Sequence, residues 1–277
     1  MKSEALEKNR MPSILAEIVE TKEEEITELK KKMNAESAGL KPHRDRNFKR
    51  TISSVDSLSI IAEIKFASPS AGVILHDKDP LEIGLIYEKA GASAISLITD
   101  RKYFKGDPKQ LPRLKSQLSL PILRKDFIID ESQITESSLL GADAVLLIAR
   151  ILTSRKLRKL LSCCEDLGMD ALTEVHDKDD IEKANECGAG IIGINNRDLD
   201  TFRVKRSTTS ELLPLIPKGV VVVSESGIQT PGHIKMLKKY SVHAALIGTA
   251  IIKSGNIEQK VNELVLAGKM DDLKERS

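Results

Sequence analysis

Aromatic side chains are scarce in this chain and tryptophan is absent: Phe, Trp and Tyr make up 3% of its 277 residues. Proteins that bind single-stranded nucleic acid stack bases on such side chains, so their scarcity argues against that class. The formal net charge is +2, which gives no electrostatic basis for a nucleic-acid or strongly acidic partner. We therefore expect no nucleic-acid partner.

Long apolar runs are also missing. No stretch approaches the roughly 20 apolar residues that a helix needs to cross a bilayer. The N-terminal segment, Met1-Lys2-Ser3-Glu4, lacks the apolar region of a signal peptide. The sequence therefore predicts no membrane association and a cytoplasmic location.

Potential metal ligands are few and scattered. The three cysteines, Cys163, Cys164 and Cys187, lack the spacing of a zinc site. The five histidines form no H-x-x-x-H or H-x-H cluster. We expect the cysteines to be packing residues or surface thiols, and we expect no bound metal.

What the chain does contain is a regular alternation that starts at residue 60. The short apolar runs predicted to be strands span residues 60–65, 94–98, 121–124, 143–148, 170–175, 190–194, 220–224 and 243–247. The amphipathic runs predicted to be helices lie near residues 80–90, 108–118, 131–140, 153–167, 178–187, 207–214, 230–239 and 256–267. Eight such units predict an α/β protein with a closed (β/α)8 barrel, the TIM barrel. An open doubly wound sheet is the alternative, but its G-x-G-x-x-G turn after the first strand is absent.

A helical segment precedes the barrel. Residues 13–33 carry apolar side chains at helical spacing, with Glu and Lys on the other face. We expect a helix docked by its apolar stripe, its charged face in solvent, and a second short helix around residues 48–55. The predicted organisation is an N-terminal helical extension over residues 1–56, covering one end of a barrel over residues 57–277.

Charged and amide side chains gather where the predicted strands end, which is where active sites lie in this fold. Glu63 and Lys65 end the first strand two residues apart, so both point to the same side. The other strand ends carry Lys125, Glu174, Asn195, Arg197, Glu225 and Ser226. An ion pair at a strand end explains Glu63 and Lys65, and a structural role explains any other single residue, but burying all of them without a function is costly. Lysines packed against carboxylates suit proton transfer.

The last two strands add a second signal. Ser226-Gly227 follows the seventh strand, and Gly248-Thr249 follows the eighth, directly before a short apolar helix at residues 250–252. Small residues in these two loops, with a helix N-terminus beside them, are typical of a phosphate site. The alternative is two glycine-containing turns with no ligand.

Five motifs that contain these residues follow the predicted strands in order. They are Ala62-Glu63-Ile64-Lys65 with Ser68-Pro69-Ser70, Lys125-Asp126-Phe127, Leu172-Thr173-Glu174-Val175, Gly193-Ile194-Asn195-Asn196-Arg197-Asp198-Leu199 and Ser224-Glu225-Ser226-Gly227-Ile228. Together they resemble the motifs of the indole-3-glycerol-phosphate synthase family, and the match runs from about residue 13 to residue 265. The resemblance implies a (β/α)8 barrel with an N-terminal helical extension.

The resemblance also implies a reaction. Members of this tryptophan-pathway family close the pyrrole ring of 1-(2-carboxyphenylamino)-1-deoxyribulose 5-phosphate and release CO2 and water. The implied partner is thus a small-molecule sugar phosphate, and the family needs no metal and no organic cofactor. We expect a monomer or a weak homodimer.

For the chemistry, the resemblance implies that Lys125 is the general acid that protonates the substrate carbonyl. Lys65 pairs with the substrate carboxylate and assists in dehydration. Glu174 transfers protons, and Glu63 orients the two lysines. The remaining catalytic residues, which position the substrate, are Asn195 and Ser226.

For binding, the resemblance implies three groups of residues. Arg197 and Glu225 contact the substrate within the polar network. Phe127 and Leu199 line an apolar pocket for the benzoate ring. The residues expected to hold the phosphate are Ser68, Gly227, Gly248 and Thr249.

The chain departs from the family pattern at Phe66 and Ala71, where many members carry basic residues, so the positive field around the first loop is weaker. Two other functions stay open. Phosphoribosylanthranilate isomerase resembles this fold and phosphate site, but it uses a Cys and an Asp, and no cysteine stands at a strand end here. A non-catalytic barrel that binds a phosphorylated ligand is the third hypothesis, and the set of proton-transfer groups argues against it.

Overall fold

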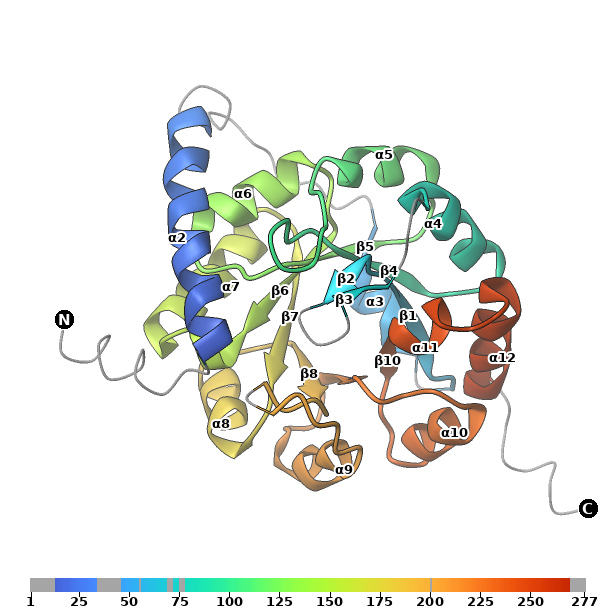
Figure 1. Ribbon diagram of the computed structural model, residues 1–277. Coiled ribbons are helices and arrows are strands. Elements are labelled where there is room, and N and C mark those ends of the chain that lie inside the picture. The colour runs from blue at the N-terminus through green and yellow to red at the C-terminus, as the bar shows by residue number, and fades with distance from the viewer. Residues whose placement is uncertain are drawn as a thin grey trace, which may run out of the picture.

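Eight parallel strands close into a barrel with helices around it, as the computed structural model shows (Figure 1). The structure describes residues 13–33, 46–54, 56–68, 72–74, 78–199 and 201–269. The barrel strands are β1 (Ser59–Ile64), β4 (Ala94–Ile98), β5 (Ile122–Lys125), β6 (Ala144–Ile148), β7 (Asp170–Val175), β8 (Ile191–Asn195), β9 (Val221–Glu225) and β10 (Ala244–Ile247). Strand β1 pairs with both β4 and β10, which closes the sheet. The predicted (β/α)8 barrel is therefore confirmed, and the open sheet is excluded.

The helices of the barrel are α4 (Pro80–Lys89), α5 (Gln110–Gln117), α6 (Glu131–Leu139), α7 (Ser154–Asp166), α8 (Lys178–Glu186), α9 (Ser207–Leu212), α10 (Pro231–Lys239), α11 (Thr249–Ile252) and α12 (Ile257–Lys269). Local sequence sets where several of them begin. Asp79 accepts a hydrogen bond from the Leu81 N–H, with Pro80 in the first turn, and Asp130 forms a capping box with Gln133. The ends of the barrel strands agree with the predicted ones to within one residue, and those of the barrel helices to within two. The short helix predicted around residues 48–55 ends earlier, at Ile52.

Smaller elements complete the fold. The 3-10 turns η1 (Ala149–Ile151) and η2 (Leu213–Leu215) follow β6 and α9. A two-stranded hairpin of β2 (Ala67–Ser68) and β3 (Gly72–Val73) stands in the loop after β1. Ser70 and Ala71 lie outside the described residues, and so does the side chain of Ser68.

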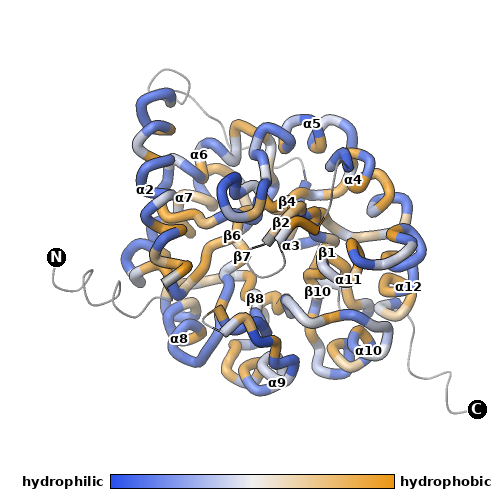
Figure 2. Tube along the Cα trace, viewed as in Figure 1, coloured by the Kyte–Doolittle hydropathy of each residue, from blue (hydrophilic) through white to orange (hydrophobic). Residues whose placement is uncertain are grey.

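The hydrophobic core follows from the composition of the strands. Strands such as β1 and β6 are nearly continuous runs of Ile, Leu, Val and Ala, and every residue of both is buried. Side chains that point into the barrel pack with one another, and those that point outward pack under the helices. Figure 2 shows apolar residues concentrated at the centre and hydrophilic residues on the outer helix faces. Within the described ranges, no helix is long and apolar enough to cross a membrane.

The N-terminal helices α2 (Ser13–Met33) and α3 (Phe48–Ile52) contact opposite ends of the barrel. Helix α2 packs beside α6 (Figure 1), and Ile18 reaches the cavity at the carboxyl ends of the strands. Helix α3 lies at the other end, where the Lys49 N–H donates a 2.8 Å hydrogen bond to Asp170, the first residue of β7. The segment expected to cover one end of the barrel therefore contacts both ends, with α2 at the carboxyl ends of the strands and α3 at the start of β7.

Candidate active site

A cavity of about 480 Å³ opens at the carboxyl ends of the barrel strands. Thirteen of the fourteen predicted site residues line it: Glu63, Lys65, Lys125, Phe127, Glu174, Asn195, Arg197, Leu199, Glu225, Ser226, Gly227, Gly248 and Thr249. The fourteenth, Ser68, belongs to β2, and its side chain lies outside the described residues. The fold therefore brings together residues from six different strand ends.

Two ammonium groups and three carboxyl groups meet inside this cavity. Lys125 Nζ lies 3.2 Å from Glu174 Oε2 and 3.5 Å from Glu225 Oε2. Lys65 Nζ lies 2.8 Å from Glu63 Oε2 and donates to Thr249 Oγ1 at 3.3 Å. All three glutamates are buried, with 1–4% of each residue exposed. Buried charges at these distances act on one another strongly, because little water screens them.

This packing moves pKa values in different directions. Burial alone would lower the pKa of Lys125, but Glu174, Glu225 and Glu63 together raise it well above its ordinary value. Burial opposes ionisation of Glu174, yet Lys125 holds the pKa of Glu174 well below its usual range. Burial raises the pKa of Glu225 to about 8, against the attraction of Lys125 and with the repulsion of Glu174. At neutral pH the site thus holds a cationic proton donor, an ionised carboxylate and a protonated carboxyl, a set suited to acid-base chemistry.

Two glycines make room for the carboxyl groups. A Cβ on Gly193 of β8 would collide with Glu225 Oε1, and a Cβ on Gly248 would collide with Glu63 Oε2. Gly193 belongs to one of the family motifs, but the sequence alone gave it no role. Both positions lack a side chain because glutamates from neighbouring strands occupy that space.

The loops after β9 and β10 form the side of the cavity predicted to take the phosphate. Directly after Glu225 the backbone turns through Ser226 and Gly227, whose φ values are +63° and +78°. A non-glycine residue in this left-handed region is strained, and such strain clusters at functional sites. Helix α11 begins at Thr249, directly after Gly248, and the Thr249 hydroxyl accepts the hydrogen bond from Lys65.

Asn196 fixes the turn after β9, a role that the sequence analysis did not predict. Its Nδ2 donates to the carbonyls of Glu225 at 2.8 Å and Ser226 at 3.1 Å. Its Oδ1 accepts from the N–H and the hydroxyl of Thr209 in α9. Next to it, Arg197 donates from Nη1 to the carbonyl of Phe202 at 2.9 Å. These bonds tie the loop after β8 to the backbone beside the predicted phosphate site.

The opposite side of the cavity is apolar. The ring centroids of Phe104 and Phe127 lie 6.0 Å apart, and both residues line the cavity. Leu199 lines it as well, together with Leu15 and Ile18 of α2. Phe104 and the α2 residues were absent from our sequence-based set, because they belong to a loop and to a helix that carry no recognisable site motif.

His176 is a further residue that the sequence analysis missed. It follows Glu174 by two positions, the spacing that places side chains on the same side of a strand. Its Nε2 lies 3.3 Å from Glu174 Oε1 and its Nδ1 3.6 Å from Asp180 Oδ2. Burial alone would lower the pKa of His176, but Asp180 and Glu174 raise it to about 9. An imidazolium therefore stands behind Glu174 at neutral pH and favours its ionised form.

This arrangement predicts a pH-dependent contribution to stability. The folded state holds the His176 proton more tightly than the unfolded state, where its pKa is the ordinary 6.5. The contribution is complete below pH 6.5 and is lost as the pH rises through about 9. We expect His176→Gln to lower the free energy of unfolding by roughly 3 kcal/mol at pH 6 and by much less at pH 9.5. Urea unfolding of both proteins at both pH values measures this, and an equal loss at the two pH values would contradict it.

The cysteines take no part in the cavity. Cys163 and Cys164 lie in α7, Cys187 caps the end of α8, and all three are free thiols. Burial raises the pKa of the Cys164 thiol, so it is a packing residue rather than a nucleophile. Among the residues that the structure describes, no three His, Cys, Asp or Glu side chains are grouped to hold a metal ion.

Comparison with known proteins identifies the family of the chain. Residues 15–264 match the family model described as indole-3-glycerol phosphate synthase. The chain is similar to the protein named indole-3-glycerol phosphate synthase from Desulfotalea psychrophila, with 43% identity over 92% of this chain and 99% of that one. It is also similar to the protein of the same name from Chlorobium luteolum, with 49% identity over 74% of this chain and 79% of that one.

Among solved structures, thiamine phosphate pyrophosphorylase from Pyrococcus furiosus has a similar fold. The TM-score is 0.57 at 14% sequence identity, and the match covers 78% of this chain and 97% of that chain. A similarity at this level of identity concerns the barrel alone. The family is shown by the sequence comparisons, and this chain belongs to the indole-3-glycerol phosphate synthase family.

Proposed function

We propose that this chain catalyses the reaction of its family. It closes the pyrrole ring of 1-(2-carboxyphenylamino)-1-deoxyribulose 5-phosphate to give indole-3-glycerol phosphate, with loss of CO2 and water, in tryptophan biosynthesis. The observation that carries this proposal is the position of Lys125, whose ammonium group lies between Glu174 and Glu225 inside the cavity. The family membership supports the same reaction.

Ring closure is the first step. The aromatic carbon that bears the carboxylate attacks the ketone carbon, a C–C bond forms, and the carbonyl electron pair takes a proton. Lys125 supplies this proton in our proposal, because its raised pKa keeps it charged. A positioned ammonium stabilises the developing negative charge on oxygen before it transfers the proton.

Decarboxylation follows. The bond between the ring and the carboxylate breaks, its electron pair restores the aromatic ring, and CO2 leaves without an external electron sink. Lys65 pairs with this carboxylate before it leaves. Glu63 accepts from Lys65 at 2.8 Å, which fixes where the ammonium group points.

Dehydration completes the reaction. The hydroxyl formed from the ketone takes a proton and leaves as water, while a base removes a proton from the neighbouring methylene carbon. Glu174 is our proposed base, since Lys125 keeps it ionised, and Lys65 assists the departing hydroxyl. Glu225, protonated at neutral pH, belongs to the polar network that binds the substrate.

The remaining residues position the substrate in this proposal. Asn195 and Ser226 hold it at the strand ends, and Arg197 binds it from the loop after β8. The benzoate ring lies against Phe127 and Leu199. The phosphate binds at the turns that contain Gly227, Gly248 and Thr249, with Ser68 from the hairpin after β1.

The proposal extends to how the protein works in the cell. We propose a monomer or a weak homodimer that acts in the cytoplasm, with residues 1–56 as an extension of the catalytic barrel at residues 57–277. Phe66 is half-buried and packs against the core. The basic residue common at that position is thus absent, and we propose that substrate affinity falls more gently with salt than in relatives that have it.

Two substrates separate this function from its alternatives. The purified chain is incubated with 1-(2-carboxyphenylamino)-1-deoxyribulose 5-phosphate and, separately, with phosphoribosylanthranilate. We expect an indole chromophore from the first and no turnover of the second. Turnover of the second alone would favour an isomerase, and tight binding of the first without product would favour a non-catalytic binder.

A further inference from the structure

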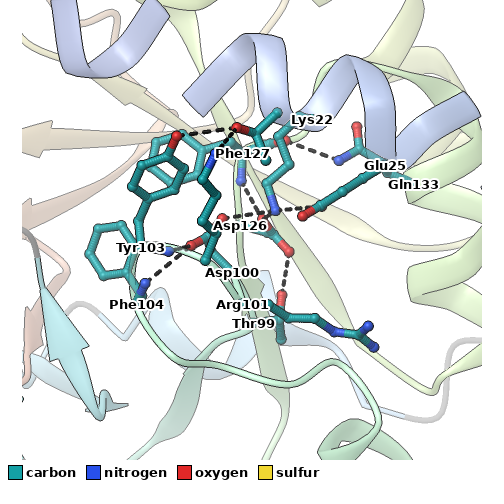
Figure 3. A network of polar contacts seen from close by, with 12 residues as sticks. Lys22, Glu25, Thr99, Asp100, Arg101, Tyr103, Phe104, Asp126, Phe127 and Gln133 are labelled. Carbon is teal, nitrogen blue, oxygen red and sulfur yellow. Dashed lines mark hydrogen bonds and ion pairs between the residues drawn. The ribbon is translucent and has the colours of Figure 1, made fainter. Parts of the chain in front are cut away.

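A lysine of helix α2 lies buried among three carboxylates beside the apolar side of the cavity (Figure 3). Lys22 is 2% exposed, and its Nζ lies 2.9 Å from a carboxylate oxygen of each of Glu25, Asp100 and Asp126. Asp100 follows the end of β4 by two residues, and Asp126 directly follows β5. One ammonium group thus joins α2 to the loops after two neighbouring barrel strands.

The two aspartates hold the backbone of the residues that form the apolar wall. Asp100 accepts from the N–H groups of Tyr103 at 2.8 Å and Phe104 at 3.1 Å. Asp126 accepts from the N–H of Phe127 at 2.8 Å. Phe104 and Phe127 are the two rings that meet at the cavity. Lys22 therefore contacts the carboxylates that hold the backbone of both phenylalanines.

Helix α2 contributes to the same wall from the other direction. Ile14, Leu15 and Ile18 line the cavity, one to two turns before Lys22. Thr21 adds a contact between its Oγ1 and the Tyr103 hydroxyl at 3.1 Å. The apolar wall thus combines three segments of the chain: α2 and the loops after β4 and β5. Lys22 belongs to the first and forms ion pairs with the other two.

The charge of Lys22 is strongly held. Burial alone would lower its pKa, but Asp126 and Asp100 raise it well above its ordinary value. Asp126 keeps a second cation, since Arg124 Nη2 lies 3.3 Å from its Oδ2. Asp100 is 0% exposed, and among the described residues Lys22 is the one cation within ion-pair distance of its carboxylate. Without Lys22, the Asp100 carboxylate would be buried without a compensating charge, which destabilises the fold. Separately, α2 would lose its ion pairs to the loops that carry Phe104 and Phe127, so the wall would shift whatever the charge of Asp100.

We propose that Lys22 is a positioning residue for the ring end of the substrate. It fixes α2 and the loops after β4 and β5 as one wall for the benzoate ring, without touching the substrate. This inference rests on the proposed function. It predicts that the loss of Lys22 weakens substrate binding more than it slows the chemical steps.

The first test compares two lysines of the same helix. Lys22→Met should raise KM for the sugar-phosphate substrate at least tenfold, with a smaller fall in kcat, because the wall moves and Lys125 remains. Lys22→Arg should bring KM back to within about threefold of the original value, since a guanidinium can bridge both aspartates. The matched control is Lys30→Met, which removes an exposed 2.9 Å pair between α2 and Asp130. It should leave KM and kcat unchanged.

The second test separates positioning from charge balance. Lys22→Met combined with Asp100→Asn removes the uncompensated charge but keeps an oxygen for the Tyr103 and Phe104 N–H groups. We expect the midpoint of thermal unfolding to return towards the original value while KM stays at least tenfold raised. This double variant also carries the test if Lys22→Met alone does not fold.

The outcomes are distinct. An unchanged KM in Lys22→Met, or a double variant that regains both stability and the original KM, would overturn the positioning role and leave the proposed function intact. A wild-type chain that forms no indole product would overturn the proposed function, and this inference with it.

Discussion

Replacing Lys125 with methionine is expected to lower kcat by about a thousandfold or more. A positioned general acid contributes roughly 10²–10⁴ in rate, and this residue also stabilises the developing oxyanion. The change leaves Glu174, Glu225 and Glu63 without their shared cation. Single-turnover measurement of indole formation, with the protein in saturating excess over the substrate, reports the loss in the chemical steps rather than in binding.

A second partly buried lysine provides the control. The Lys115 side chain is 16% exposed, against 17% for Lys125, and pairs with the buried Asp143 at 2.6 Å outside the cavity. Lys115→Met should lower the free energy of unfolding and leave kcat within twofold. If Lys125→Met kept kcat within tenfold of the original value, Lys125 would not be the general acid.

Replacing Glu174 with glutamine is expected to lower kcat by about 10²–10³. Glutamine has nearly the same shape but cannot accept a proton, so dehydration loses its base. The fall in kcat should exceed any change in KM, because the missing interaction belongs to the chemical step. Steady-state kinetics at pH 7 measures both constants.

The matched control is a change of the same kind at Glu225. This carboxyl has a pKa of about 8 and carries a proton at pH 7, so the amide of Glu225→Gln resembles its working form. We expect a fall in kcat of less than tenfold at pH 7. Equal losses for the two variants would show that Glu174 and Glu225 do not differ in protonation as described.

The barrel was predictable because its signals are local. Each strand is a short apolar run, and several helices begin at a capping residue such as Asp79 or Asp130. Once the strands were counted, their carboxyl ends gave the site, since parallel strands bring those ends to one rim. Lys125 and Glu174 were found in this way without any knowledge of their contacts.

Other features of the site were not predictable, because they depend on contacts between distant segments of the chain. Lys22 falls on the same helical stripe as Ile18 and Ile26, a spacing that places it on the buried face. We expected the charged side chains of this helix to face solvent, and for Lys22 that was wrong. Its partners Asp100 and Asp126 follow two different strands, and only the closed barrel brings them together.

The roles of His176 and Gly193 were also not predictable from the sequence, although their partners lie closer to them in the chain than those of Lys22. The two-residue spacing between Glu174 and His176 was visible in the sequence, but their proximity also depends on how the chain turns after β7. The requirement for glycine at position 193 appears only when Glu225 of the neighbouring strand occupies that space. Pairing between strands is a tertiary property, so neither role could be derived from local pattern.

The proposed reaction is tested most directly by following the carboxyl carbon of the substrate. The chain is supplied with 1-(2-carboxyphenylamino)-1-deoxyribulose 5-phosphate labelled with ¹³C in the carboxylate, and labelled CO2 and the indole product are quantified together. Our account predicts one labelled CO2 for each indole-3-glycerol phosphate, and neither product from the Lys125→Met protein on the same time scale. Indole product that retains the label, or labelled CO2 released at the same rate by the Lys125→Met protein, would contradict it.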